Sequence, residues 1–120
     1  MKKTDLVIAS IFLICSLFMI ACKKGSSGSD VPADVCTTVT AKFAANVLPL
    51  MQTKCSFNSN CHGAGSSNSG GVLVTYAQIS AKSATIKSQV AAGIMPQSGS
   101  MTTAEKNVII CWVNSGAMNN

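Results

Sequence analysis

The residues whose side chains could do chemistry lie close together in the middle of the chain. Cys55 and Cys61 are separated by five residues, and His62, the single histidine of the sequence, follows Cys61 directly. Two thiols and an imidazole this near to one another can hold a covalent cofactor, pair as a disulfide, or contribute ligands to a metal ion. Residues 55–62 are therefore the first candidate for a functional site.

The N-terminus has the pattern of an export signal. Two lysines precede an apolar run from Leu6 to Ile20, and Cys22 follows a small residue. A basic start, an apolar run of this length and a small residue before the cut are typical of a secretory signal peptide. The cysteine after the small residue is similar to the lipobox of bacterial lipoproteins, which implies that residues 1–21 are removed and Cys22 is lipidated. The alternative is an uncleaved anchor, for which the run is slightly short.

The rest of the chain divides into a tether and one small domain. Residues 22–35 are rich in Gly, Ser and Lys without apolar periodicity, as in a flexible linker. The domain, residues 36–120, has few bulky side chains, and its only leucines are Leu48, Leu50 and Leu73. A domain this small is marginal without additional stabilisation. We therefore expect a buried cofactor or disulfides, and export from the cytoplasm permits both.

Charge and composition narrow the function classes. The formal net charge is +5, but the lysines are sparse and no arginine or basic cluster of the kind that tracks phosphates is present, so nucleic-acid binding is not expected. The folded part has a single acid, Glu105, and no second histidine, so we expect no enzyme. The lysines could attract an acidic partner.

The first predicted helix leads into the cysteine pair. It begins at Asn46 as the N-cap, carries Pro49 in its first turn, and ends at Cys55. The Gly- and Ser-rich residues 63–71 are predicted to form a loop, and the isolated apolar residues 72–74 an extended segment.

The second half is also helical in pattern. Thr75 and Ser83 start two short helices, and apolar residues recur every four positions in the second, up to Ile94. Thr102 and Glu105 form a capping box that opens the last helix. The pattern predicts an all-α fold of three or four short helices with long loops.

These motifs together resemble the class I c-type cytochrome domain, from residue 47 to about residue 117. The resemblance rests on Cys61-His62-Gly63, Gly93-Ile94-Met95-Pro96, and Thr102-Thr103-Ala104-Glu105-Lys106 leading into Trp112. It implies one covalent haem c, attached through Cys55 and Cys61, with His62 and Met95 as axial iron ligands. The usual gap between the cysteines is two residues, so whether Cys55 bonds the porphyrin, or Cys61 alone does, stays open.

The resemblance also implies a role. With both axial positions filled, no position remains for oxygen or substrate, so the expected activity is electron transfer. The expected protein is a monohaem lipoprotein in the bacterial cell envelope, anchored to a membrane through Cys22. Its partners would be redox proteins, and no small-molecule substrate is expected.

The remaining cysteines leave alternatives open. Cys36 and Cys111 can form a disulfide that ties the start of the domain to its last helix, and a rival pattern also pairs Cys55 with Cys61. Four cysteines allow three connectivities. The alternative function is a disulfide-stapled binding or structural lipoprotein without haem. A copper site of Cys61, His62 and Met95 is weaker, because a blue-copper site needs a second histidine.

Overall fold

The structure is a computed structural model that describes residue 32 and residues 34–120. The predicted signal peptide, Cys22 and most of the tether lie outside these residues. In chain order the elements are α2 Val35–Thr38, η1 Phe43–Val47, α3 Leu48–Leu50, η2 Met51–Cys55, α4 Tyr76–Ala81, α5 Ser83–Ala91 and α6 Thr103–Asn114. The described residues contain no strand, which confirms the all-α class. None of their helices is long and apolar enough to cross a membrane.

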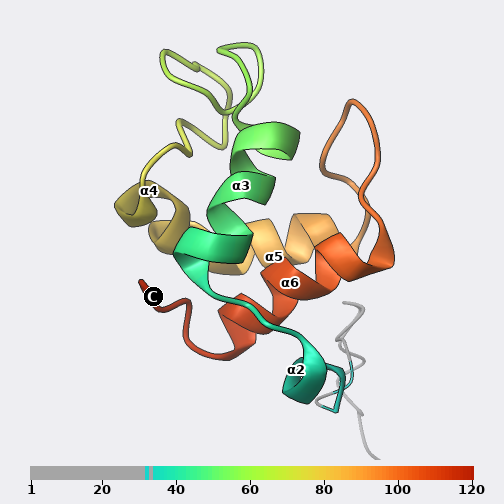
Figure 1. Ribbon diagram of the computed structural model, residues 1–120. Coiled ribbons are helices and arrows are strands. Elements are labelled where there is room, and N and C mark those ends of the chain that lie inside the picture. Colours follow the sequence, from blue (N-terminus) through green and yellow to red (C-terminus); the bar gives the residue numbers. More distant parts are fainter. Residues whose placement is uncertain (1–31, 33) are drawn as a thin grey trace, which may run out of the picture.

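The elements η1, α3 and η2 form one uninterrupted helical run, which Figure 1 shows above α5 and α6. Counting this run once, the described residues have five helical segments where three or four were predicted. The additional segment is the short helix α2, which was not predicted. The prediction that Asn46 caps the first helix is wrong. The run begins at Phe43, and the Asn46 side chain accepts from the backbone N–H of Lys42 at 3.1 Å.

The two π-helical turns, η1 and η2, follow from the spacing of the buried residues. Phe43, Val47, Met51 and Cys55 are all buried and recur every four positions. In an α-helix a strict repeat of four drifts round the axis by about 40° per step, because a turn has 3.6 residues. The wider turns of a π-helix offset that drift. All four side chains therefore stay on one face, and Cys55 ends the buried stripe.

Trp112 of α6 is the centre of the core. It is 1% exposed, and its ring centroid lies 5.6 Å from that of Phe43, which in turn meets Tyr76 edge-on at 5.0 Å. The polar ends of the two larger aromatics are satisfied by the C-terminal residues. Trp112 Nε1 donates to the Met118 carbonyl at 2.9 Å, and the Tyr76 hydroxyl donates to the Ala117 carbonyl at 3.0 Å. Buried aromatic pairs of this kind stabilise beyond the area that they bury.

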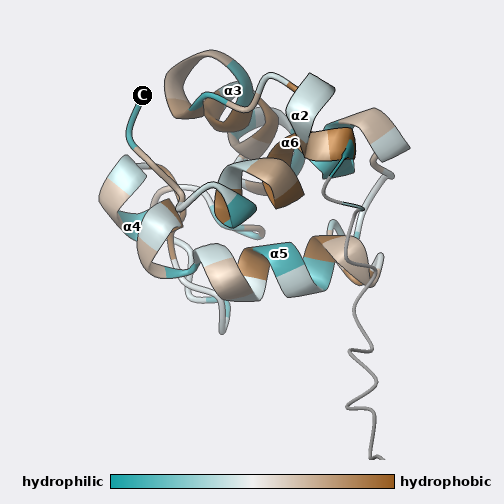
Figure 2. Cartoon of the chain, turned by 90° about the horizontal axis from the view of Figure 1, so that it is seen from below, coloured by the Kyte–Doolittle hydropathy of each residue, from teal (hydrophilic) through white to brown (hydrophobic). Residues whose placement is uncertain are grey.

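The helix starts predicted at Thr75 and Thr102 are confirmed. Each hydroxyl accepts a backbone N–H three residues later, and the side chain at that position, Gln78 or Glu105, reaches back to the N-cap. The predicted apolar face of α5 is correct only in part, and Figure 2 shows its apolar bands alternating with polar ones. Ile86 and Val90 are buried, whereas Ile94 lies beyond the helix end and is 56% exposed.

The disulfide between Cys36 and Cys111 is formed, with a Cα–Cα distance of 5.2 Å, and it joins α2 to α6. It spans 75 positions of sequence, for which the chain-entropy model gives about 4 kcal/mol of stabilisation. Cys55 and Cys61 are free, so the pattern with a second disulfide is not the one that the structure adopts.

Candidate functional site

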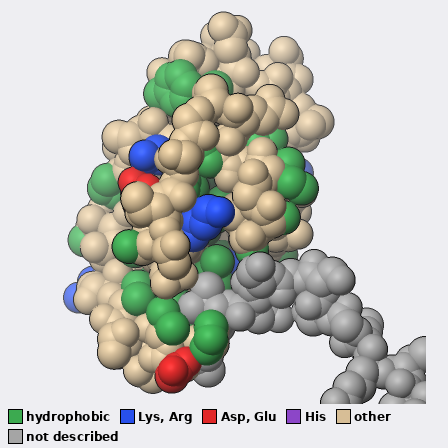
Figure 3. Space-filling view, turned by 90° about the vertical axis from the view of Figure 1, so that its right-hand side faces the viewer, with side chains coloured by type: hydrophobic (Ala, Val, Ile, Leu, Met, Phe, Trp, Pro, Cys, Tyr) green, Lys and Arg blue, Asp and Glu red, His purple; other side chains and the backbone are tan. Residues whose placement is uncertain are grey.

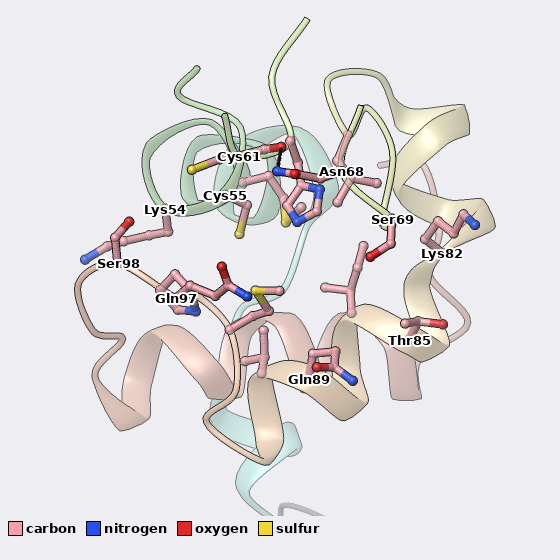
Figure 4. Close-up of a pocket in the computed structure, with 18 of the residues that line it drawn as sticks. Lys54, Cys55, Cys61, Asn68, Ser69, Lys82, Thr85, Gln89, Gln97 and Ser98 are labelled. Atoms are coloured by element: carbon pink, nitrogen blue, oxygen red, sulfur yellow. Dashed lines mark hydrogen bonds between the residues drawn. The ribbon is translucent and has the colours of Figure 1, made fainter. Parts of the chain in front are cut away.

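The four residues predicted to form the site all line one cavity of about 410 Å³. Cys55 comes from the end of η2, Cys61 and His62 from the loop that follows, and Met95 from the segment after α5. Figure 4 shows the cavity between that loop and α5. Its volume is within the range of about 300–1,000 Å³ that ligand pockets occupy, so residues far apart in sequence converge on a space large enough for a small cofactor.

The floor of the cavity is apolar and its mouth is polar. Buried side chains from three parts of the core form the floor: Met51, Leu73, Ile86 and Val90. Exposed polar residues form the mouth: Asn60, Asn68, Ser69, Lys82, Thr85, Gln97 and Ser98. An apolar pocket with a few polar groups at its opening is the usual form of a cofactor site.

The ring of His62 is held in one tautomer. Its Nδ1 lies 2.9 Å from the carbonyl oxygen of Gly71. A carbonyl oxygen can only accept, so Nδ1 carries the hydrogen, and in the neutral ring the lone pair is on Nε2. Metal-binding histidines have this same arrangement, in which a backbone carbonyl fixes one nitrogen and leaves the other as the ligand.

Two glycines are required by the position of the His62 segment. A Cβ on Gly70 would lie 2.5 Å from Cε1 of the His62 ring, and a Cβ on Gly63 would lie 2.6 Å from the carbonyl oxygen of Asn58. Real Cβ contacts are not this short. Backbone therefore packs directly against the imidazole, and the glycine after Cys61-His62 is fixed by crowding in the same loop.

The loop between the two cysteines folds back on itself. The His62 N–H donates to the carbonyl of Cys55 at 2.9 Å, and the His62 carbonyl accepts from Leu73 N–H at 2.8 Å. The first bond brings the backbone of His62 beside the end of η2 despite the wide gap. The second joins it to the extended segment that lines the cavity.

The two thiols have different surroundings. Cys55 is 9% exposed, and burial, with a smaller contribution from the nearby charge of Cys61, raises its pKa to about 11. Cys61 is half-buried. In Figure 4 the two sulfur atoms point in different directions. Because of its raised pKa, Cys55 presents a neutral thiol at neutral pH. Cys61 is the more accessible of the two.

Met95 reaches the cavity through a reversal at the end of α5. Gly93 has φ +70°, a left-handed conformation that glycine adopts without strain. The N–H groups of Ile94 and Met95 both donate to the Gln89 carbonyl, at 3.0 and 3.2 Å. The chain therefore turns back at the helix end, and the half-buried Met95 lines the cavity.

The chain matches no protein-family model, no curated protein and no solved structure.

Among the described residues no three His, Cys, Asp or Glu side chains gather as a group that could hold a metal ion. The lining of the cavity offers the imidazole of His62 together with the sulfur atoms of Cys55, Cys61 and Met95. This set fits a haem, because its iron accepts an imidazole and a thioether while free thiols bond its edge.

Three participants in the site were not found from the sequence: Gly70, the Gly71 carbonyl and Asn68. The loop composition marked residues 63–71 as glycine-rich, which predicts a loop but not a packing surface. A backbone carbonyl has no sequence signal, because every residue carries one.

Proposed function

We propose that this chain is a monohaem c-type cytochrome that carries electrons in the bacterial cell envelope. The observation that carries the proposal is the hydrogen bond from His62 Nδ1 to Gly71, made in a cavity that Met95 and two free thiols also line. A disulfide-bonded module has no need of a histidine held in the ligand tautomer beside unpaired cysteines.

Each site residue has one role in this proposal. His62 would offer Nε2 and Met95 its thioether sulfur to the iron, and Cys61, with or without Cys55, would hold the macrocycle by a thioether bond. A bound haem supplies a one-electron change at iron, and a histidine–methionine ligand pair favours the reduced state. The Gly71 carbonyl keeps the imidazole oriented as the charge on the metal changes.

The apolar floor lowers the polarity around the site. Met51, Leu73, Ile86 and Val90 exclude water from one side of the cavity, and charge is stabilised less in such surroundings. Low local polarity therefore acts in the same direction as the thioether ligand, towards a higher reduction potential. If His62 and Met95 both bind the iron, no position is left for a substrate, which favours electron transfer over catalysis.

The surface fits a small exported carrier. The described residues carry five lysines against two acids, Asp34 and Glu105. Figure 3 shows a few lysine and acidic side chains scattered over one face, among hydrophobic side chains and other residues. Lys54 and Lys82 both line the cavity, and Lys54 is paired there with Glu105. From the exposed Lys82 and the excess of lysines over acids we propose an acidic redox protein as the partner. The lipid on Cys22 and the tether would hold the domain at a membrane.

The test is to produce the full chain with haem-maturation machinery. We expect a Soret band, sharp α and β bands after reduction, and a native mass that exceeds that of the lipidated peptide by one haem, retained after denaturation. A colourless protein with the mass of the lipidated peptide alone contradicts the proposal.

The second candidate is a disulfide-stapled binding module of the envelope without haem. The Cys36–Cys111 bond supports it, since this staple stabilises the domain without any cofactor. It predicts a colourless protein that unfolds at the same temperature with or without haem-maturation machinery. The two candidates are therefore separated by the same preparation.

A further inference from the structure

Asparagine side chains hold the backbone of Cys61 on both sides. The Cys61 N–H donates to Asn58 Oδ1 at 3.1 Å and to the Asn58 carbonyl at 3.2 Å. The Cys61 carbonyl accepts from Asn68 Nδ2 at 2.8 Å and from the Ser66 hydroxyl. Asn68 Nδ2 also donates to the Asn60 carbonyl at 2.6 Å. Both hydrogens of the Asn68 amide can thus be used on the peptide groups that precede His62.

These hydrogen bonds lie in the loop between Cys55 and Cys61, which is longer than the usual two-residue spacing of a haem-attachment motif. Five residues separate the cysteines, and each added residue gives a loop more conformations to lose on ordering. Asn58 makes the turn inside this loop, and its carbonyl also accepts the Gly63 N–H at 2.8 Å. Asn68 reaches the same segment from the far side, and its side chain lines the cavity (Figure 4).

We propose that Asn58 and Asn68 are positioning residues that fix the Cys61 thiol and the His62 imidazole relative to Cys55. Their hydrogen bonds would restrict the five-residue loop as a two-residue spacing between the cysteines restricts a shorter one. This inference rests on the proposed function. The two asparagines use different atoms of the side-chain amide. Asn58 accepts through its oxygen, and Asn68 donates through its nitrogen. An aspartate has the same shape but can only accept.

The test compares Asn58→Asp with Asn68→Asp in the full chain, two isosteric changes that add the same charge. Asn58→Asp keeps the acceptor, so hydrogen exchange at the amides of Cys61, His62 and Gly63 should stay within about twofold of wild type. Asn68→Asp removes both donated bonds and sets a carboxylate against two carbonyl oxygens. Exchange at these amides should be about tenfold faster, as the loss of one or two hydrogen bonds predicts.

The second measurement is the fraction of chain with haem bonded at Cys61, from peptide mass spectra of protein made with haem-maturation machinery. It should fall severalfold in Asn68→Asp and not in Asn58→Asp. Asn58→Leu, which lacks the acceptor, should resemble Asn68→Asp, so that aspartate restores what leucine loses. If Asn68→Asp does not accumulate, Asn68→Ala replaces it with the same expected result.

Equal behaviour of the two aspartate variants would overturn the proposal, because added charge would then explain both. A wild-type chain without haem contradicts the proposed function instead, and the exchange comparison still decides whether the asparagines hold the loop. Faster exchange in Asn68→Asp with unchanged haem attachment at Cys61 also counts against a positioning role.

Discussion

The ammonium nitrogen of Lys54 lies 3.3 Å from Oε1 of Glu105. Lys54 is in the last turn of η2, beside Cys55, and Glu105 belongs to the capping box of α6. Lys54 also donates to the Ser100 carbonyl at 3.3 Å. One lysine thus joins the helix that carries the first site cysteine to the start of the helix that carries Trp112.

Replacing Glu105 by glutamine should lower the melting temperature at neutral pH. The Thr102 backbone N–H, with further bonds from Lys54 and the Thr102 hydroxyl, holds the pKa of Glu105 below its ordinary value. Glutamine can still cap the helix, so Glu105→Gln removes the charge and keeps the cap. In the unfolded chain the carboxylate has a pKa of about 4.3 and takes up a proton more readily than in the folded chain. The charged Glu105 side chain therefore stabilises the fold above that pH. This stabilisation is lost as the pH falls through the lower pKa of the folded state. The difference in melting temperature should therefore shrink between neutral and strongly acidic pH, and a constant difference contradicts this account.

Gly70→Ala should displace the His62 ring. The new methyl group would lie 2.5 Å from Cε1 of the ring, and overpacking of this kind costs about 1–3 kcal/mol. Chemical denaturation measures the loss, and the shift of the ring should also weaken the Gly71 hydrogen bond. Ser69→Ala, at an exposed neighbouring position, is the control and should unfold as the wild type does. A Gly70→Ala chain as stable as that control would show that the ring is not packed on this backbone.

Met95→Ala should lower the reduction potential and open a coordination position to added imidazole or carbon monoxide. The reason is that a thioether ligand raises the potential of haem iron. Met101→Ala is the matched control, because Met101 is buried at 8% exposure but does not line the cavity. It should cost about 2–5 kcal/mol of stability without a change of spectrum or potential. Unchanged potential and ligand binding in Met95→Ala would mean that another group is the distal ligand.

In chain made without haem-maturation machinery, alkylation at pH 8 should label Cys61 before Cys55. The Cys55 thiol is buried and its pKa is about 11, so little thiolate is present, and the thiolate is the reactive form. We expect a difference in rate of about tenfold or more, measured by mass spectrometry of the labelled peptides. In 6 M guanidinium the two should react alike, and equal rates in the folded chain would contradict the burial of Cys55.

Local signals in the sequence were sufficient for much of the fold. Capping boxes at Thr75 and Thr102 are determined by residues three apart, so both helix starts could be read directly. The first helix was placed too late, because an asparagine is a good N-cap and the sequence does not say that Asn46 bonds back to Lys42. Ile94 continues the spacing of four set by Ile86 and Val90, but α5 ends at Ala91 and the chain turns at the left-handed Gly93.

The site was predictable by residue type and not by geometry. Cysteine, histidine and methionine have distinctive chemistry, so Cys55, Cys61, His62 and Met95 could be named from the sequence, and all four line one cavity. The bond from His62 to a backbone carbonyl and the contacts of Asn68 depend on how a nine-residue glycine-rich loop closes. Loop closure is decided by tertiary contacts and leaves no periodic pattern.

The strict repeat of four from Phe43 to Cys55 fixes how many residues this helical run must contain. One residue inserted between them would turn everything beyond it by about 100° round the axis. The aromatic core and the Cys55 sulfur could then no longer both face inward. Changes in length are therefore tolerated far less in this segment than in the loop after His62, and mutants with inserted residues should lose the domain here before they lose it anywhere along residues 63–69.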